Sequence, residues 1–88
     1  MTKVYTLGIQ NFDALDGFMT STDIKLFFDK EACKKWMDQE IKNQAKKGFK
    51  LKQYGNPEYW EFIKETLHGN YKHVFYGQYR EVINEADL

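Results

Sequence analysis

The stretch DKEACKKWMDQEIKNQAKKG, residues 29–48, carries the clearest structural pattern in this chain of 88 residues. Asp29 is placed to cap a helix, because its carboxylate can accept the free backbone N–H groups of the first turn. Gly48 follows two lysines at the position where helices usually end. The pattern predicts an amphipathic helix over about residues 30–47. Its apolar stripe consists of Ala32, Cys33, Trp36, Met37, Ile41 and Ala45.

Two strands are predicted before this helix. Residues 3–9 and residues 22–28 both alternate between apolar and polar side chains, and β-forming residues dominate them. The side chains expected to face the core are Tyr5, Leu7 and Ile9 in the first strand and Ile24, Leu26 and Phe28 in the second. Residues 10–21, rich in turn formers, predict a long hairpin loop or an ordered Ω-like loop between two antiparallel strands.

A strand and a second helix are predicted after residue 48. Residues 49–54 alternate, so they indicate a strand with Phe49 and Leu51 inward. Asn56 followed by Pro57 is typical of a helix start. The following pattern predicts a helix over about residues 57–68, with Tyr59, Trp60, Ile63 and Leu67 on one face and Gly69 as its stop.

The last predicted element is a β-rich run from Tyr71 to Ile83. Gly77 and Gln78 inside it could form a two-residue turn, or the run could be one continuous or bulged strand, which we favour. The element order is then ββαβαβ. This order predicts an α+β fold, with a small antiparallel or mixed sheet and two helices packed on one face.

Length and composition predict a single domain over residues 1–88. A chain this short feeds one hydrophobic core, and 42% apolar and 17% aromatic residues suit a globular protein. Cys33 is the single cysteine, so no internal disulfide can form, and a reducing, cytoplasmic location is expected. We expect no signal peptide and no membrane span, since no apolar run has the required length.

Residues for catalysis or metal binding do not form a recognisable motif. Cys33 falls in the apolar stripe of the helix, which indicates a buried structural thiol rather than a nucleophile. The spacing of His68 and His73 matches no common zinc arrangement. We therefore predict no catalytic residue, no metal site and no cofactor; an enzyme or a small-ligand binder would require a deep pocket.

The carboxy-terminal third combines many aromatic residues with acidic ones, more than one small core can take up. Exposed tyrosines bordered by carboxylates are typical of protein interfaces, because aromatic residues are enriched at binding hot spots and charges steer encounter. We predict a non-catalytic protein-binding surface, serving either another protein or a second copy of the chain. The predicted anchors are Tyr59, Phe62, Tyr76 and Tyr79, and the predicted steering acids are Glu58, Glu61 and Glu65.

A nucleic-acid-binding role is the alternative. The net charge is zero, but residues 34–52 hold seven lysines against two acids, whereas both flanking segments are acidic. Lysines can neutralise phosphates, and an aromatic ring between them can stack on a base. The residues of this predicted patch are Lys46, Lys47, Phe49, Lys50 and Lys52.

The chain resembles small accessory proteins of bacteriophages and mobile elements, including anti-CRISPR inhibitors of host defence. The resemblance rests on the short chain, the strand-to-helix passage from Asp23 to Ala32, and acids that could imitate phosphates. It implies an inhibitor of a host nucleic-acid-processing or CRISPR defence enzyme, acting by occlusion rather than catalysis. The high lysine content departs from the strongly acidic members of that group.

Overall fold

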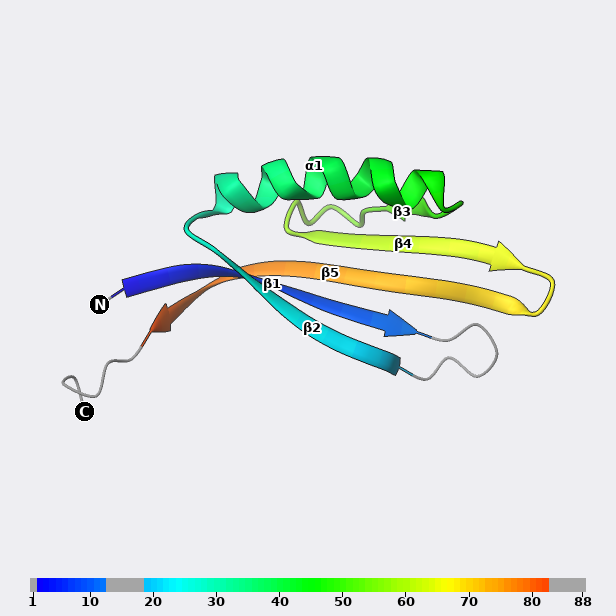
Figure 1. Ribbon diagram of the computed structural model, residues 1–88, viewed down its shortest axis with the longest axis horizontal. Coiled ribbons are helices and arrows are strands. Elements are labelled where there is room, and N and C mark those ends of the chain that lie inside the picture. The colour runs from blue at the N-terminus through cyan, green and yellow to red at the C-terminus, as the bar shows by residue number, and fades with distance from the viewer. Residues whose placement is uncertain (1, 13–18, 83–88) are drawn as a thin grey trace.

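One helix lies along one face of a five-stranded antiparallel sheet (Figure 1). The computed structural model describes residues 2–12 and 19–82. In chain order the elements are β1 (Thr2–Phe12), β2 (Met19–Phe27), α1 (Lys30–Lys46), β3 (Lys50–Lys52), β4 (Tyr59–Thr66) and β5 (Gly69–Val82). Across the sheet the strands follow the order β2-β1-β5-β4-β3. No helix of the described residues is long and apolar enough to cross a membrane.

The predicted helix over residues 30–47 is confirmed, and its ends follow the predicted chemistry. The Ala32 N–H donates to Asp29 Oδ1 at 2.8 Å, which satisfies a donor of the first turn. After the helix, Gly48 has a φ of 89°, in the left-handed region that glycine adopts without strain. Its N–H donates to the Ala45 carbonyl at 3.1 Å and closes the last turn.

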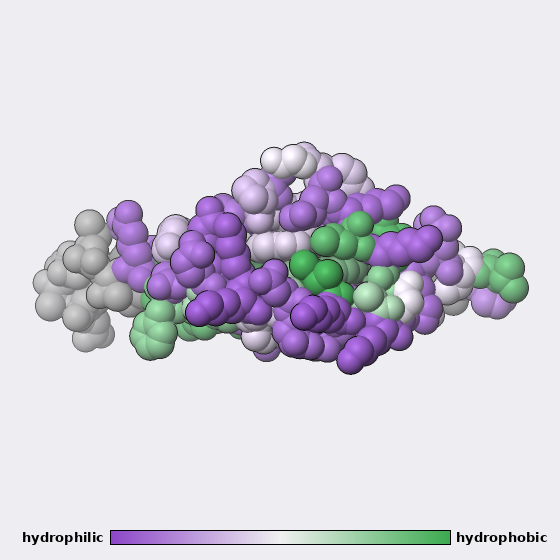
Figure 2. Space-filling model, turned by 90° about the horizontal axis from the view of Figure 1, so that it is seen from above, coloured by the Kyte–Doolittle hydropathy of each residue, from purple (hydrophilic) through white to green (hydrophobic). Residues whose placement is uncertain are grey.

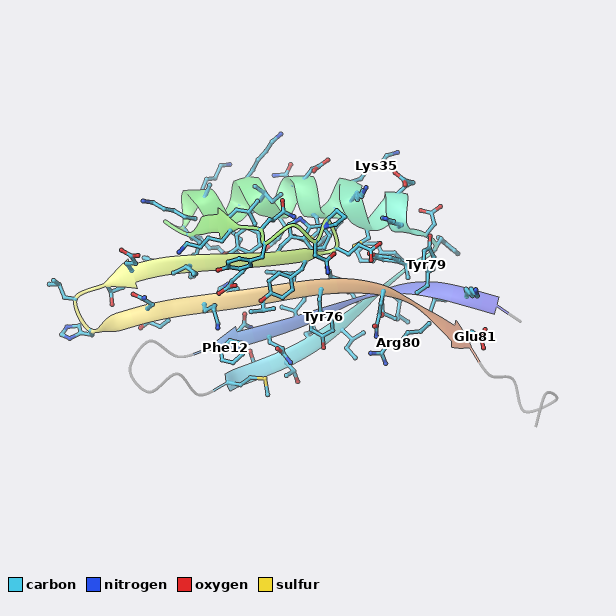
Figure 3. The ribbon with its side chains drawn as sticks, turned by 180° about the vertical axis from the view of Figure 1, so that it is seen from behind. Phe12, Lys35, Tyr76, Tyr79, Arg80 and Glu81 are labelled. Atoms are coloured by element: carbon cyan, nitrogen blue, oxygen red, sulfur yellow. The ribbon has the colours of Figure 1, made fainter. Side chains whose placement is uncertain are left out.

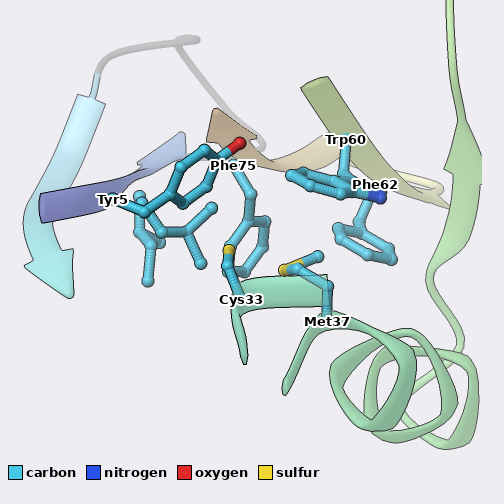
Figure 4. Packing of buried hydrophobic residues seen from close by; sticks show 8 residues of the cluster. Tyr5, Cys33, Met37, Trp60, Phe62 and Phe75 are labelled. Atoms are coloured by element: carbon cyan, nitrogen blue, oxygen red, sulfur yellow. The ribbon is translucent and has the colours of Figure 1, made fainter. Parts of the chain in front are cut away.

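The hydrophobic core lies between α1 and the sheet (Figure 4). Tyr5, Leu7 and Ile9 of β1 face the helix, as predicted. They pack with Cys33 and Met37 of α1 and with Trp60, Phe62 and Phe75 of the neighbouring strands. Cys33 is fully buried, and this burial raises the pKa of its thiol to about 11. The interpretation of Cys33 as a structural thiol is therefore consistent with its surroundings.

The predicted second helix, residues 57–68, is wrong: this segment is the strand β4. Asn56 does not cap a helix; its side chain accepts the Glu58 N–H at 2.9 Å within a turn. Aromatic and β-branched residues fill the strand, and β5 offers a long edge for it to pair with. A two-residue turn then joins β4 to β5, closed where Thr66 Oγ1 donates to the Gly69 carbonyl at 2.6 Å. The local sequence pattern fitted both the helical repeat of about 3.6 residues and the strand repeat of two residues, and pairing with β5 decides in favour of the strand.

The inward face predicted for residues 22–28 is also wrong. The register pairs Tyr5 with Phe27, so the odd-numbered residues of β2 face the helix. Phe27 packs near Trp36, with ring centroids 6.1 Å apart. Ile24 and Leu26 point the other way and are 60% and 68% exposed, and Phe28, which follows the end of the strand, is 96% exposed. The predicted alternation was out of step by one residue. A shift of one residue places every side chain of a strand on the opposite face.

The remaining strands agree with the predictions in kind but differ in length. The strand predicted at residues 3–9 extends over Thr2–Phe12, and the one at 49–54 shortens to Lys50–Lys52. The β-rich run at the end is one continuous strand, β5, without a turn or bulge at Gly77. Of the loop predicted at residues 10–21, residues 13–18 lie outside the described residues.

Two glycines in the central strands make room for tyrosine rings on opposite faces of the sheet. On the helix side, a methyl group at Gly77 would collide with the ring of Tyr5. On the other side, a Cβ at Gly8 would lie 2.5 Å from Cζ of Tyr76. Each tyrosine thereby covers a glycine of the neighbouring strand, and the close approach fills the space that the missing side chain leaves.

Replacing Gly77 by alanine should destabilise the protein by about 1–3 kcal/mol, because the buried Tyr5 ring cannot move without disturbing the core. Urea unfolding followed by circular dichroism measures this change. Gln78→Ala, an exposed neighbour on the same strand, is the matched control and should alter the free energy of unfolding by less than about 0.5 kcal/mol. Equal stability of the two variants would contradict the close packing at Gly77.

Candidate functional site

The sheet face opposite α1, here called the outer face, is the candidate site. No element of the described residues covers it (Figures 1 and 3). Figure 3 shows Phe12, Tyr76 and Arg80 on this side, away from Lys35 on the helix. The registers place Val4, Gln10 and Phe12 of β1, Ile24 and Leu26 of β2, Lys72, Val74, Tyr76 and Arg80 of β5, Tyr59, Glu61 and Ile63 of β4, and Lys50 and Lys52 of β3 on this face.

The side of the molecule that carries α1 has a different character. Seen from above, hydrophilic side chains cover most of this surface around a smaller hydrophobic area (Figure 2). The exposed residues of the helix include Lys35, Asp38, Gln39 and Lys42. A solvated helix surface of this kind needs no partner. The outer face is therefore the better candidate for an interface.

Exposed apolar side chains gather along β2 and just after it, and we define the β2 border as Met19, Ile24 and Leu26 of the outer face together with Phe28, which follows the strand. Met19 is half exposed and the other three are exposed further. Leu26 and Phe28 also line a shallow pocket of about 280 Å³ that Val4, Phe27 and Ala32 complete. Sequence analysis missed this group because it assigned three of its members to the core.

Tyr59 and Tyr76, two predicted anchors, do lie together on the outer face. They are opposite residues of the β4–β5 pair, and both are half-buried. Tyr59 Oη donates to Glu61 Oε2 at 3.3 Å, and the Lys72 ammonium lies 3.9 Å from the other carboxylate oxygen. Burial and the nearby Glu61 raise the pKa of Tyr59. Glu61 is thus 8% exposed and engaged within the sheet, which leaves it unsuited to steering a partner.

The other predicted anchors lie elsewhere. Phe62 is 1% exposed and belongs to the core, so its assignment to a surface is a correction. In a strand, Phe62 and Trp60 share one face, whereas the predicted helix would have separated them. Tyr79 is exposed on the helix side of β5, where its ring packs edge-on against Tyr5 with centroids 4.9 Å apart. Its hydroxyl accepts the Lys30 N–H at 3.2 Å.

The predicted steering acids are also distributed over different parts of the molecule. Glu58 forms an ion pair with Lys30 at 2.8 Å, beside the start of α1. This carboxylate, together with burial as the larger cause, raises the pKa of Tyr5 to about 12. Glu65 is exposed on the outer face, where it lines a second shallow pocket with Lys50 and Lys52. The three acids therefore do not form one acidic surface.

The predicted basic patch is divided as well. Lys46 and Lys47 are exposed at the end of α1, whereas Lys50 and Lys52 project from β3 onto the outer face. Phe49 is half-buried and stacks on His73, with ring centroids 4.4 Å apart and planes at 29°. A ring held in this way cannot stack on a base, which removes Phe49 from the predicted patch.

The Phe49–His73 contact predicts a pH dependence of stability. Burial, with a contribution from Lys47 and against the opposing effect of Glu40, lowers the pKa of His73 below 6.5. The unfolded chain therefore takes up this proton first as the pH falls. The stability contributed by neutral His73 is complete above about pH 6.5 and is lost as the pH falls below that value toward the folded-state pKa.

His73→Gln should remove this part of the acid sensitivity, whereas His68→Gln, at an exposed position, should keep it. The measurement is the free energy of unfolding in urea at several pH values from about 7.5 to about 5.5, above the range in which most carboxylates titrate. Identical pH profiles for wild type and His73→Gln would contradict the assignment.

The geometry defines the protein's class as an α+β fold with one helix on a five-stranded antiparallel sheet and one open sheet face. Among residues 2–12 and 19–82 there is no group of three or more histidine, cysteine or acidic residues arranged to hold a metal ion. Comparison of the chain with protein-family models, with curated proteins and with solved structures finds no match.

Proposed function

We propose that this protein is a non-catalytic protein-binding module that recognises its partner with the outer face. The observation that carries the proposal is the β2 border, three of whose apolar side chains are 60% exposed or more. An antiparallel sheet with one open face normally presents polar residues there. Burying each such side chain contributes about 1.5–3 kcal/mol, so this border is a strong candidate for association.

The central part of the outer face suits the same role. Tyr59 and Tyr76 lie beside each other, each with an apolar ring and a polar hydroxyl. Tyrosines of this kind supply rigid contact area at low cost in conformational entropy, which is why they recur at binding hot spots. The polar groups around them, Glu61 and Lys72, are already paired with each other. A binding role therefore accounts for this region better than proton-transfer chemistry.

Replacing Leu26 and Phe28 together by serine should abolish partner capture without unfolding the protein, because both side chains are exposed. The test is affinity capture from host lysate with nuclease present, read by mass spectrometry. Lys35→Ser with Lys42→Ser, on the exposed side of α1, is the matched control and should capture the same partner in the same amount. If both double variants capture the same proteins as wild type, the outer face is not the interface.

A narrower role, inhibition of a host nucleic-acid-processing or CRISPR defence enzyme, stays a prediction from the resemblance. Its support is the uncovered outer face, which could occlude a partner's site, while the single cysteine, Cys33, is buried in the core. The identity of the captured partner decides it. An enzyme that acts on nucleic acid, and that loses activity when the protein is added in stoichiometric amount, would establish the narrower role.

Single-stranded nucleic acid is the second candidate partner, favoured by one observation. Lys50 and Lys52 are exposed on the same face as Tyr59 and Tyr76, which differs from the patch predicted from sequence. Basic side chains around exposed rings are the usual arrangement for binding bases and phosphates without sequence preference. This candidate uses the outer face at its β3–β4 side, away from the β2 border.

If nucleic acid binds there, Lys50→Glu with Lys52→Glu should weaken binding of a single-stranded oligonucleotide and reduce the slope of log affinity against log salt by about 1.4. Lys46→Glu with Lys47→Glu changes the charge equally at the end of α1 and should leave that slope unchanged. Fluorescence anisotropy at several salt concentrations measures both. No binding by the wild type, or equal effects of both pairs, would exclude this use of the outer face.

A further inference from the structure

The free edge of β2 is the longest unprotected strand edge in the described sheet. β2 pairs with β1 on one side and with nothing among the described residues on the other. The opposite edge of the sheet, β3, has three residues, and its two lysines are exposed. A short, charged strand is the usual protection against further pairing, whereas β2 runs for nine residues with exposed Ile24 and Leu26.

The hydrogen bonds of the sheet show which backbone groups of β2 are free. The Gly77 N–H donates to the Glu58 carbonyl, on the β4 side, so odd-numbered residues of β5 bond toward β4. Because directions alternate along antiparallel strands, even-numbered residues of β5 and β1 bond to each other. Odd-numbered residues of β1 and β2 then bond to each other as well. The N–H and C=O groups of Thr22, Ile24 and Leu26 therefore point to the free edge.

A side-chain contact agrees with this direction. The Ile24 N–H donates to Asp23 Oδ1 at 2.8 Å, a bond outside the ladder with β1. The carboxylate thus occupies the central donor of the free edge in the single chain. If a second chain paired with this edge, the Ile24 N–H would donate to a carbonyl of that chain instead. The Asp23 carboxylate would then be released to interact with a positively charged side chain.

The residues of β2 are complementary to β2 itself in one register. With a two-fold axis at Ile24, the Ile24 residues of two copies are opposite, and each Asp23 faces Lys25 of the other copy. Registers centred on Thr22 or on Leu26 place Lys25 opposite Met19 or Phe27, without an opposite charge. Asp23 and Lys25 would be a non-hydrogen-bonded pair, in which opposite side chains come closest.

The same register places the remaining side chains favourably. The Ile24 side chains of the two copies meet on the outer face, and each Leu26 lies opposite Thr22, so the apolar border loses exposure. Asp23 and Lys25 lie on the helix side, where the Lys25 ammonium stands 5.4 Å from the centre of the Trp36 ring. Because the axis is perpendicular to the sheet, both helices lie on the same side and the two outer faces become continuous.

We propose that β2 pairs with β2 of a second copy of this chain, in the register centred on Ile24, and forms one antiparallel sheet across the two copies. The inference deepens the proposed function and rests on it for the role of the β2 border as an interface. It commits the backbone edge of β2 to a second copy, and the continuous outer face of the two copies, with the side chains of Leu26 and Phe28, stays open to another partner.

Charge exchange in the full-length chain tests the pairing. We compare the wild type with D23K, K25D and the double variant D23K/K25D by sedimentation equilibrium over about 1 to 500 µM. Each single variant sets like charges opposite each other twice and should weaken dimerisation by about tenfold or more. The double variant restores opposite charges and should dimerise within about threefold of the wild type.

A backbone variant keeps the test decisive if a charge change disturbs folding. In Ile24→Pro the lost N–H is one that points to the free edge, so pairing with β1 is retained while the interchain ladder is broken. This variant should be monomeric, and its circular dichroism spectrum should match that of the wild type.

Three results would overturn the proposal. One is a wild-type protein that is monomeric over the whole concentration range, and another is a dimer that all the variants retain, as stacking of two outer faces would give. The third is a double variant that dissociates as readily as the single ones. None of these results touches the capture experiment with the serine variants, so failure of the self-pairing and failure of the proposed function remain distinguishable.

Discussion

The pairing of β1 with β5 is the constraint on which the rest of this structure depends. It places the first strand in the middle of the sheet, where residues 5–9 are buried on both faces. One face receives α1 and the aromatic core, and the other receives Tyr76 across Gly8. Because β5 is long, its other edge also holds β4, so the order of the whole sheet follows from this central pair. With the single helix on one side, the other side stays open.

The parts of the fold that could be predicted from the sequence are those with local chemical signals. α1 has a capping aspartate, a terminal glycine and an apolar stripe, and each acts within a turn or two of its own position. The inward face of β1 was also predictable, because a strand in the centre of the sheet buries its most apolar alternate residues regardless of its neighbours. The burial of Cys33 was predictable from its place in the apolar stripe of the helix.

The rest depended on which strand pairs with which, and this is not a local property. Trp60 and Ile63 share a helical face, whereas Trp60 and Phe62 share a strand face, and residues 59–66 satisfy both patterns until β5 is available as a partner. In β2 the register with β1 decides which alternate side chains face the helix. The sequence pattern alone predicted Ile24 and Leu26 as core residues, although they are exposed. Tyr59 and Tyr76, named as anchors from the sequence, do lie on the outer face, whereas the β2 border was missed. Phe62 was assigned to the surface of a predicted helix, whereas it lies in the core.

The central pair also has a consequence for how the chain reaches its structure during synthesis. Thr2 lies opposite Val82, so the middle of the sheet joins residues from nearly opposite ends of the described chain. This contact closes a long loop of chain. The conformational entropy of that loop must be lost before strand pairing contributes favourable free energy. Until β5 has left the ribosome, β1 and β2 can form a hairpin, but a lone two-stranded hairpin is marginally stable at best. We therefore expect the nascent protein to acquire its stable sheet late in synthesis.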